Sequence, residues 1–146
     1  MPIEVRPLEP RDREVWLPLW QGYLTFYETA VPDAVTEATW RRIVDPSGPI
    51  RAFGAFDDAG GMIGFVHYLF HPVTWSVAER CYLEDLFVRP DARGTGAGQA
   101  LIEAVYRAAD EAGADQVYWL TATTNATARK LYDRVARATP FMKYQR

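Results

Sequence analysis

A glycine-rich segment, VRPDARGTGAG (residues 88–98), contains the residues whose types and spacing most directly indicate chemistry. Gly94, Gly96 and Gly98 alternate with other residues there, although each glycine adds backbone freedom that folding must remove. The segment joins an apolar run to an alanine-rich run with helical spacing. Closely spaced glycines at a helix N-terminus let backbone N–H groups converge on a phosphate. The segment therefore predicts an anion-binding loop.

Three other interpretations of this loop can be compared with the sequence. A dinucleotide-binding turn requires Gly-x-Gly-x-x-Gly, but position 99 is Gln and the next apolar run ends in Thr121, where an acidic residue is expected. A nucleoside-triphosphate loop requires Gly-Lys-Ser/Thr, which does not occur. An ordinary flexible turn stays open on the motif alone.

Acid–base chemistry is indicated by two carboxylates and a tyrosine. Glu84 and Asp85 are adjacent in the apolar run CYLEDLFV (residues 81–88), and strand alternation predicts that they point to opposite faces. One of them then faces the core or a site, where a carboxylate can accept a proton or hold a positive charge. Tyr132, with an ordinary phenol pKa of about 10, stays protonated at neutral pH and can act as a proton donor. A solvated strand residue and a core tyrosine are the structural alternatives.

The remaining reactive side chains indicate no metal site. His67 and His71 share one face of a strand without a third ligand, so we expect exposed strand histidines. Cys81 is the only cysteine, which excludes an internal disulfide and predicts buried packing.

These residues must be positioned by a mixed, mostly antiparallel α/β (α+β) sheet with helices. Turn signals at residues 58–61 predict a hairpin, Pro18 predicts a bend, and Gly113 lies where a helix C-terminus is expected. Asp12 and Thr36 are the expected N-caps of the first two helices. The expected strands are residues 3–8, 50–57, 62–71, 81–88, 116–121 and 140–146, and the expected helices are residues 13–28, 36–45, 96–113 and 125–137.

Length and composition predict one domain, residues 1–146, with a packed core, because 49% of the residues are hydrophobic. The net charge of −3 gives no electrostatic reason to bind nucleic acid and favours cationic small molecules or basic tails as partners. We expect no signal peptide and no membrane span, since the N-terminal run is charged and no apolar run is long enough. The expected location is the cytoplasm.

Two motifs together resemble a known family. Arg93-x-x-Gly96-x-Gly98 resembles motif A of the GNAT superfamily of acyl-CoA-dependent N-acetyltransferases. The segment TTNATARKLYDRV is similar to the family's Asn-x-x-Ala-x-x-Leu-Tyr segment, with Asn125 and Tyr132 in place. Within the family, YLEDLFV resembles the diamine (spermidine/spermine and thialysine) acetyltransferases. WLPLWQGYLTFYE, IEAVYRAADEAGADQVYW and FMKYQR resemble the fungal-type histone, polyamine and D-amino-acid acetyltransferases, and this similarity runs over nearly the whole chain. One departure is ATPF (residues 138–141), which replaces the usual Gly-Phe and leaves the end of the sheet in doubt.

The resemblance implies a sheet covered by helices on both faces, with a splayed strand pair that holds acetyl-CoA as cosubstrate. In the family, the strand beside the splay binds the pantetheine arm and the loop amides bind the pyrophosphate. The implied cofactor-binding residues are Leu86, Phe87, Val88, Arg93, Gly94, Thr95, Gly96, Ala97, Gly98, Gln99 and Asn125.

The resemblance also implies catalytic roles. Tyr132 is the implied general acid and Glu84 the implied general base for direct attack in a ternary complex, and the implied acceptor-binding residues are Tyr27, Glu28, Glu84 and Asp85. The acceptor is then a primary amine on a polyamine, an amino acid or a lysine-like group. The alternatives are a catalytically inactive CoA-binding regulatory module and an unrelated nucleotide-binding protein. A homodimer is expected because related enzymes pair.

Overall fold

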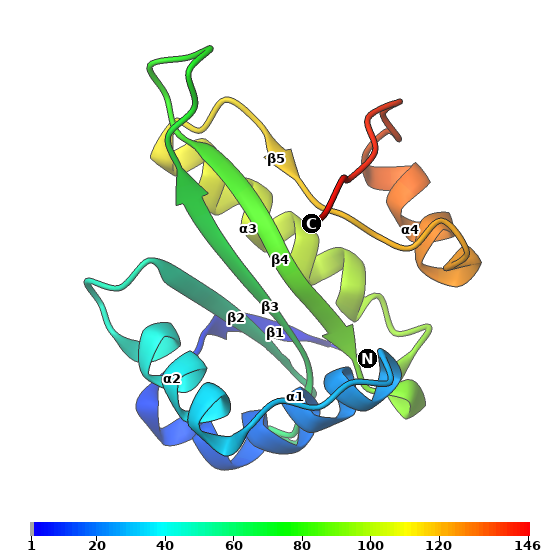
Figure 1. The fold of residues 1–146 in the computed structure, drawn as a ribbon. Helices are drawn as coiled ribbons and strands as arrows, with labels where there is room; N and C mark the ends of the chain where they lie inside the picture. The colour runs from blue at the N-terminus through cyan, green and yellow to red at the C-terminus, as the bar shows by residue number, and fades with distance from the viewer. Residues whose placement is uncertain (1) are drawn as a thin grey trace.

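The computed structural model describes residues 2–146 and contains a five-stranded sheet with the order β1-β2-β3-β4-β5 (Figure 1). Neighbouring strands are antiparallel except β4 and β5, which are parallel, so the mixed, mostly antiparallel sheet is confirmed. The strands are β1 (Glu4–Pro7), β2 (Ile50–Phe56), β3 (Met62–His71), β4 (Arg80–Val88) and β5 (Val117–Tyr118), and the α-helices are α1 (Arg13–Phe26), α2 (Asp33–Val44), α3 (Ala97–Ala112) and α4 (Ala126–Val135).

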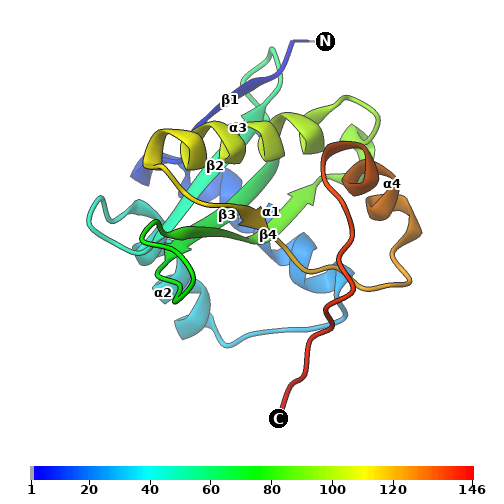
Figure 2. The ribbon, with the colours of Figure 1, turned by 90° about the horizontal axis from the view of Figure 1, so that it is seen from above.

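Helices cover both faces of this sheet (Figure 2). On one face, α3 packs through residues such as Leu101 against β3 residues such as Val66. On the other face, α1 and α2 bury Trp16 and Trp40 against Phe65. Fully burying a large apolar side chain contributes about 2 kcal/mol, so these two clusters fix the sheet between its helices.

β4 and β5 diverge after a short paired segment. Only Cys81 with Val117 and Tyr82 with Tyr118 are paired, and the chain then turns away toward α4 (Figure 1). Within residues 2–146, β4 therefore has no strand partner on this edge from Leu83 to its end. An unpaired strand edge offers N–H and C=O groups to an extended ligand. The fifth strand is shorter than the expected residues 116–121. Because it ends early, β4 and β5 separate beyond Tyr118, and this separation is the splay that the family resemblance implied.

The end of the chain differs from the expectation. Residues 140–146, expected to form a last strand, have no regular secondary structure. Gly113 does end α3, with a φ of 72° in the left-handed region, as expected. None of the helices in residues 2–146 combines the length and apolar character that a bilayer crossing requires.

Asp12 lies at the expected N-cap position of α1 but makes no side-chain capping bond, whereas Thr36 is not the N-cap of α2, which is Pro32. The Asp12 carboxylate accepts hydrogen bonds from the Glu9 backbone N–H and the Arg6 guanidinium, and makes no capping bond to α1. Thr36 lies inside α2, which begins at Asp33, and its hydroxyl accepts from Trp20 Nε1 at 3.0 Å. Neither side chain therefore supplies the capping bond that the sequence analysis expected.

Candidate active site

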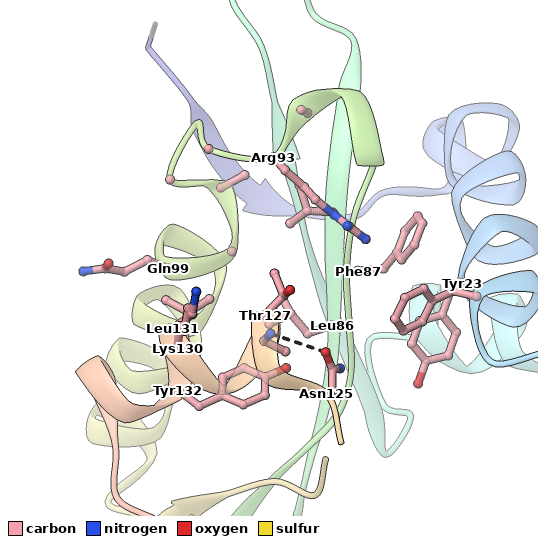
Figure 3. Close-up of a pocket in the computed structure, with 18 of the residues that line it drawn as sticks. Tyr23, Leu86, Phe87, Arg93, Gln99, Asn125, Thr127, Lys130, Leu131 and Tyr132 are labelled. Atoms are coloured by element: carbon pink, nitrogen blue, oxygen red, sulfur yellow. Dashed lines mark hydrogen bonds between the residues drawn. The ribbon is translucent and has the colours of Figure 1, made fainter. Parts of the chain in front are cut away.

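A cleft of about 620 Å³ lies where β4 has lost its partner (Figure 3). The C-terminal end of α1, the edge of β4, the glycine-rich loop, the first turn of α3, and α4 contribute to its walls. The residues of the cleft that the sequence analysis had singled out are Tyr27, Leu86, Phe87, Val88, Arg93, Gly94, Gly96, Ala97, Gly98, Gln99, Asn125 and Tyr132. The splay thus gathers segments far apart in the sequence around one cleft.

The glycine-rich loop presents bare backbone to the cleft. Gly94 and Gly96 have φ angles of 81° and 86°, in the left-handed region that favours glycine. A Cβ atom placed at either position meets no atom within 4 Å, so nothing in the protein occupies the adjoining space. Gly96 is the N-cap of α3, whose first amides have no partner inside the helix. Thr95 does not line the cleft, because its hydroxyl donates to the Ala92 carbonyl at 2.7 Å and braces the loop.

The charge of the cleft is opposite to that of the whole chain. Arg93, Lys130 and Arg134 line it, and none of the described lining residues is a carboxylate. The Arg93 side chain reaches across the cleft toward Phe87 (Figure 3). With the N-terminus of α3, these cations suit a polyanionic ligand.

Tyr132 and Asn125 project from the α4 side of the cleft (Figure 3). The Tyr132 ring packs edge-on against Trp119, with centroids 5.4 Å apart, and burial raises the pKa of its phenol to about 12. Asn125 is the N-cap of α4 and accepts from the Ala128 backbone N–H at 3.3 Å, which leaves its amide donors available to a ligand. Tyr132 therefore holds its proton at neutral pH beside open space.

Glu84 and Asp85 do not point to opposite faces, contrary to the expectation. His67 of β3 pairs with Asp85 and Tyr68 pairs with Leu83, so Glu84 is the extra residue of a bulge. Leu83 and Leu86, three positions apart, both pack on the face of the sheet that α3 covers, in the cluster that includes Leu101 and Val66. The alternation is interrupted between them, and both carboxylates lie away from that cluster. The bulge thereby brings the two charges together.

Neither Glu84 nor Asp85 lines the cleft. Desolvation raises the pKa of Glu84, and the neighbouring charge of Asp85 raises it further, while the nearby Tyr82 hydroxyl lowers it. Asp85 contacts Tyr23, which does line the cleft, so the two regions are connected through α1. Two negative charges beside a cationic cleft can hold a cationic amine there.

The strand histidines are not both exposed, as the sequence analysis expected. His67 is buried beneath α1 and bonded to Asp85, whereas His71 is half-buried and bonded to the Tyr118 hydroxyl. Within residues 2–146, no group of three or more His, Cys, Asp or Glu side chains is placed to hold a metal ion. Cys81 is fully buried, which confirms the packing role, and burial raises the pKa of its thiol to about 11.

A family model described as the acetyltransferase (GNAT) family matches residues 15–136. The chain belongs to the GNAT acetyltransferase family. It is 43% identical over 145 residues to the D-amino-acid N-acetyltransferase HPA3 of Saccharomyces cerevisiae, an alignment that covers 99% of this chain and 90% of the relative. The uncharacterized N-acetyltransferase YhfO of Bacillus subtilis is 31% identical over 134 residues, covering 90% of this chain and 87% of YhfO. These relatives show that the chain is an N-acetyltransferase.

Other matches agree with this GNAT assignment. The thialysine N-epsilon-acetyltransferase of Bos taurus is 34% identical over 71 residues, which cover 49% of this chain and 41% of that one. The structure of AAC(6')-Iy with a bisubstrate analogue superposes with a TM-score of 0.86 at 23% identity, covering 100% of this chain and 98% of the other. An AAC(6')-Iy complex with CoA gives a TM-score of 0.85 at 23% identity, covering 99% and 94% of the two chains. The sheet and helices therefore have the GNAT fold.

Some residues that line the cleft were not predicted from the sequence, and some predicted site residues do not line the cleft. Glu28 is exposed just after α1 and, like Glu84 and Asp85, does not line the cleft. The lining residues that the sequence analysis did not assign to the site are Tyr23, Phe26, Ala92, Thr127, Ala128, Lys130, Leu131 and Arg134. Tyr23, Phe26 and Tyr27 share one side of α1 at helical spacing, but that spacing is the same for a core face.

Proposed function

We propose that the chain transfers an acetyl group from acetyl-CoA to a primary amine by direct attack in a ternary complex. The observation that carries the proposal is the single cleft that combines open glycine backbone and three cations with a protonated phenol. Acetyl-CoA supplies the acetyl group as an activated thioester. The residues described below hold it, hold the amine and move the protons.

The cleft fits an elongated polyanion with an amide-bearing arm. Backbone N–H groups of Gly94 to Gln99 and the Arg93 guanidinium bind the diphosphate in this proposal, since their surroundings are open and cationic. The edge of β4 at Leu86, Phe87 and Val88 binds the arm as an added strand would. Asn125 donates to the same arm from the opposite wall.

Replacing Gly96 with alanine tests the diphosphate assignment. A methyl group there projects into the open space of the loop, and alanine at a φ of 86° is strained by about 1 kcal/mol. We expect the Kd for CoA, measured by calorimetry, to rise about tenfold, which corresponds to about 1.4 kcal/mol. Gly60→Ala is the matched control, because Gly60 has a φ of 83° and equally open surroundings in the distant β2–β3 turn. Equal CoA affinity of the two variants would contradict the assignment.

In this proposal the amine is activated beside the cleft, where Glu84 and Asp85 lie. Glu84 accepts the proton of the bound ammonium, directly or through water, and its raised pKa brings it closer to a useful base. Asp85, with Tyr27 and Glu28 at the end of α1, supplies further charge and contact to the acceptor. Tyr132 then donates its proton to the departing thiolate. The backbone N–H of Val88 is proposed to polarise the acyl carbonyl.

The proposed acceptor class rests on the two carboxylates beside the cleft and on the names of the relatives. Glu84 and Asp85 favour a positively charged amine. The relatives' names specify D-amino-acid and thialysine N-epsilon acetylation. A polyamine, an amino acid and a lysine-like side chain all satisfy this chemistry, and we propose that the acceptor is one of them.

An amine panel tests the function. Purified protein with acetyl-CoA is supplied in turn with spermidine, D-alanine, D-lysine, thialysine and a lysine-containing peptide, and released CoA thiol is measured. We expect saturable release with at least one amine. Binding of acetyl-CoA without release with any amine would instead identify a catalytically inactive CoA-binding module. Absence of CoA binding would overturn the whole proposal.

We also propose that the chain forms a homodimer through its C-terminal tail, residues 137–146. Phe141, Met142 and Tyr144 are 89%, 76% and 90% exposed, although each is large and apolar. Among the described residues, none makes a backbone hydrogen bond to the tail. A second copy offers the same apolar tail and the same short β5 edge, so a symmetric pair buries both.

If the tail forms the dimer interface, polar substitutions in the tail should dissociate the dimer, whereas a similar substitution elsewhere should not. We expect the intact chain to be a dimer at micromolar concentration by light scattering, and the Phe141→Ser/Tyr144→Ser variant to be a monomer. Trp75→Ser is the control, because Trp75 is an equally exposed aromatic, at 94%, on the β3–β4 connection. A monomeric intact chain, or loss of the dimer with Trp75→Ser alone, would count against the tail.

A further inference from the structure

A buried polar chain links the sheet core to the wall of the cleft. Trp16 Nε1 donates to His67 Nε2 at 3.1 Å, His67 Nδ1 lies 2.9 Å from Asp85 Oδ2, and the Tyr23 hydroxyl donates to Asp85 Oδ1 at 2.6 Å. Trp16 and His67 are 0% and 1% exposed, and the Asp85 side chain is 15% exposed. This row of hydrogen-bonded side chains therefore runs from a water-excluded interior to a partly exposed carboxylate.

The direction of these bonds fixes the state of His67. The indole N–H of Trp16 can only donate, so His67 Nε2 must accept and carries no proton. In the neutral ring, the proton then sits on Nδ1 and donates to Asp85. Asp85 accepts one hydrogen bond on each oxygen, which locks its rotation and leaves further lone pairs free.

Asp85 in turn fixes the Tyr23 hydroxyl, which makes no other hydrogen bond among the described residues. The Tyr23 ring stacks on Trp20, with centroids 5.6 Å apart, and meets the Phe87 ring edge-on at 6.2 Å. Tyr23 lies on the cleft wall opposite Tyr132 and Asn125 (Figure 3). Burial and the charge of Asp85 raise the pKa of Tyr23, so its hydroxyl remains a donor.

We propose that His67 is a positioning residue, which orients the Asp85 carboxylate so that it fixes Tyr23 and presents its remaining lone pairs to the acceptor amine. This inference rests on the proposed acetyl transfer and adds a residue to it. His67 touches no substrate; it acts through Asp85. The imidazole also spans the distance between Trp16 and Asp85, so one buried side chain satisfies both polar partners.

A matched pair of substitutions separates positioning from burial. In His67→Asn, the side-chain amide N–H takes the place of Nδ1 and can still donate to Asp85, while the bond to Trp16 is lost. In His67→Gln, the side-chain carbonyl reaches the place of Nε2 and can still accept from Trp16, while the bond to Asp85 is lost. Both variants shorten or reshape a fully buried ring, so thermal unfolding measures their common structural cost.

We expect His67→Gln to raise the KM for the best amine of the panel about tenfold, because a hydrogen bond to a charged group is worth at least that factor. The KM for acetyl-CoA should stay within about twofold, since its proposed contacts are elsewhere. His67→Asn should recover most of the acceptor KM. His71→Gln is the control, because His71 bonds Tyr118 and Pro72 instead. Equal effects of the Asn and Gln variants on both KM values, in proportion to lost stability, would overturn the proposal.

A second readout does not need activity. The chain has only two histidines, so the ¹H–¹⁵N long-range spectrum of ¹⁵N-histidine-labelled protein, assigned with His71→Gln, resolves His67. We expect His67 protonated on Nδ1 and unprotonated on Nε2 at neutral pH. A proton on Nε2 would overturn the proposal even if acetyl transfer is confirmed. If the expected tautomer is found but no amine releases CoA, the proposed function is wrong, although the hydrogen bonds from Trp16 through His67 to Asp85 are confirmed.

Discussion

We expect the Tyr132→Phe variant to lose about 10²-fold in kcat, while its Kd for acetyl-CoA stays within about threefold of the original. The phenylalanine ring preserves the edge-on contact with Trp119 and the apolar wall of the cleft. Only the hydroxyl is removed, and with it the proposed proton donor to the departing thiolate. Single-turnover kinetics with the best amine measure the chemical step directly.

The raised pKa of Tyr132 is compatible with this role. Burial raises the pKa of the phenol to about 12, which makes it a weaker acid than a solvated tyrosine. Desolvation raises the pKa of a thiol in the same direction, as burial does for Cys81 in the core. A thiolate released in the cleft is desolvated too and becomes a stronger base. The raised pKa of Tyr132 therefore does not by itself prevent proton donation to the departing thiolate.

Tyr106→Phe is the matched control for Tyr132→Phe. The Tyr106 hydroxyl donates to the Val135 carbonyl at 2.8 Å and holds the end of α4 to α3, outside the residues that line the cleft. We expect this variant to lose stability without a comparable loss of kcat. An unchanged kcat in Tyr132→Phe, or equal losses in both variants, would remove Tyr132 from the proposed role.

The parts of the fold that were predicted correctly depend on local requirements. The left-handed φ of Gly96 and of Gly113 requires glycine at a helix start and a helix end, and these residues stand out in the sequence. The hairpin between β2 and β3 follows from its glycine turn in the same way. The loop side of the cleft was accessible from sequence because a few adjacent residues determine it.

The parts that were missed depend on partners distant in sequence. The bulge at Glu84 exists only because β3 pairs with β4 on both sides of it, and strand alternation alone predicts the opposite orientation. His67 is buried because Trp16, 51 positions away, supplies a donor to its ring. Residues 140–146 have a strand-like composition, but no strand of the described chain pairs with them. Local patterns carry no information on such pairings.

The second large effect is expected for Glu84→Gln. If Glu84 is the base, its amide replacement accepts no proton, and we expect kcat/KM for the amine to fall about 10²-fold at neutral pH. The acid limb of the pH profile that belongs to Glu84 should also disappear. That limb exists because the carboxylate form is required, so activity declines as pH falls through the raised pKa of Glu84.

The neighbours of Glu84 allow a test based on the direction in which the acid limb shifts, and a purely structural role of Glu84 would not produce these shifts. Asp85 raises the pKa of Glu84 by charge, so Asp85→Asn should move the acid limb to lower pH. The Tyr82 hydroxyl lowers the same pKa, so Tyr82→Phe should move the limb to higher pH. Both variants also change contacts near the acceptor and lower the height of the profile, but the position of the limb does not depend on its height.

Opposite shifts in these two variants, together with the absence of the limb in Glu84→Gln, would identify Glu84 as the titrating base. A limb that stays at one pH in all three variants would assign the proton transfer to another group, and the bulge in β4 would then serve only to bring Asp85 to Tyr23.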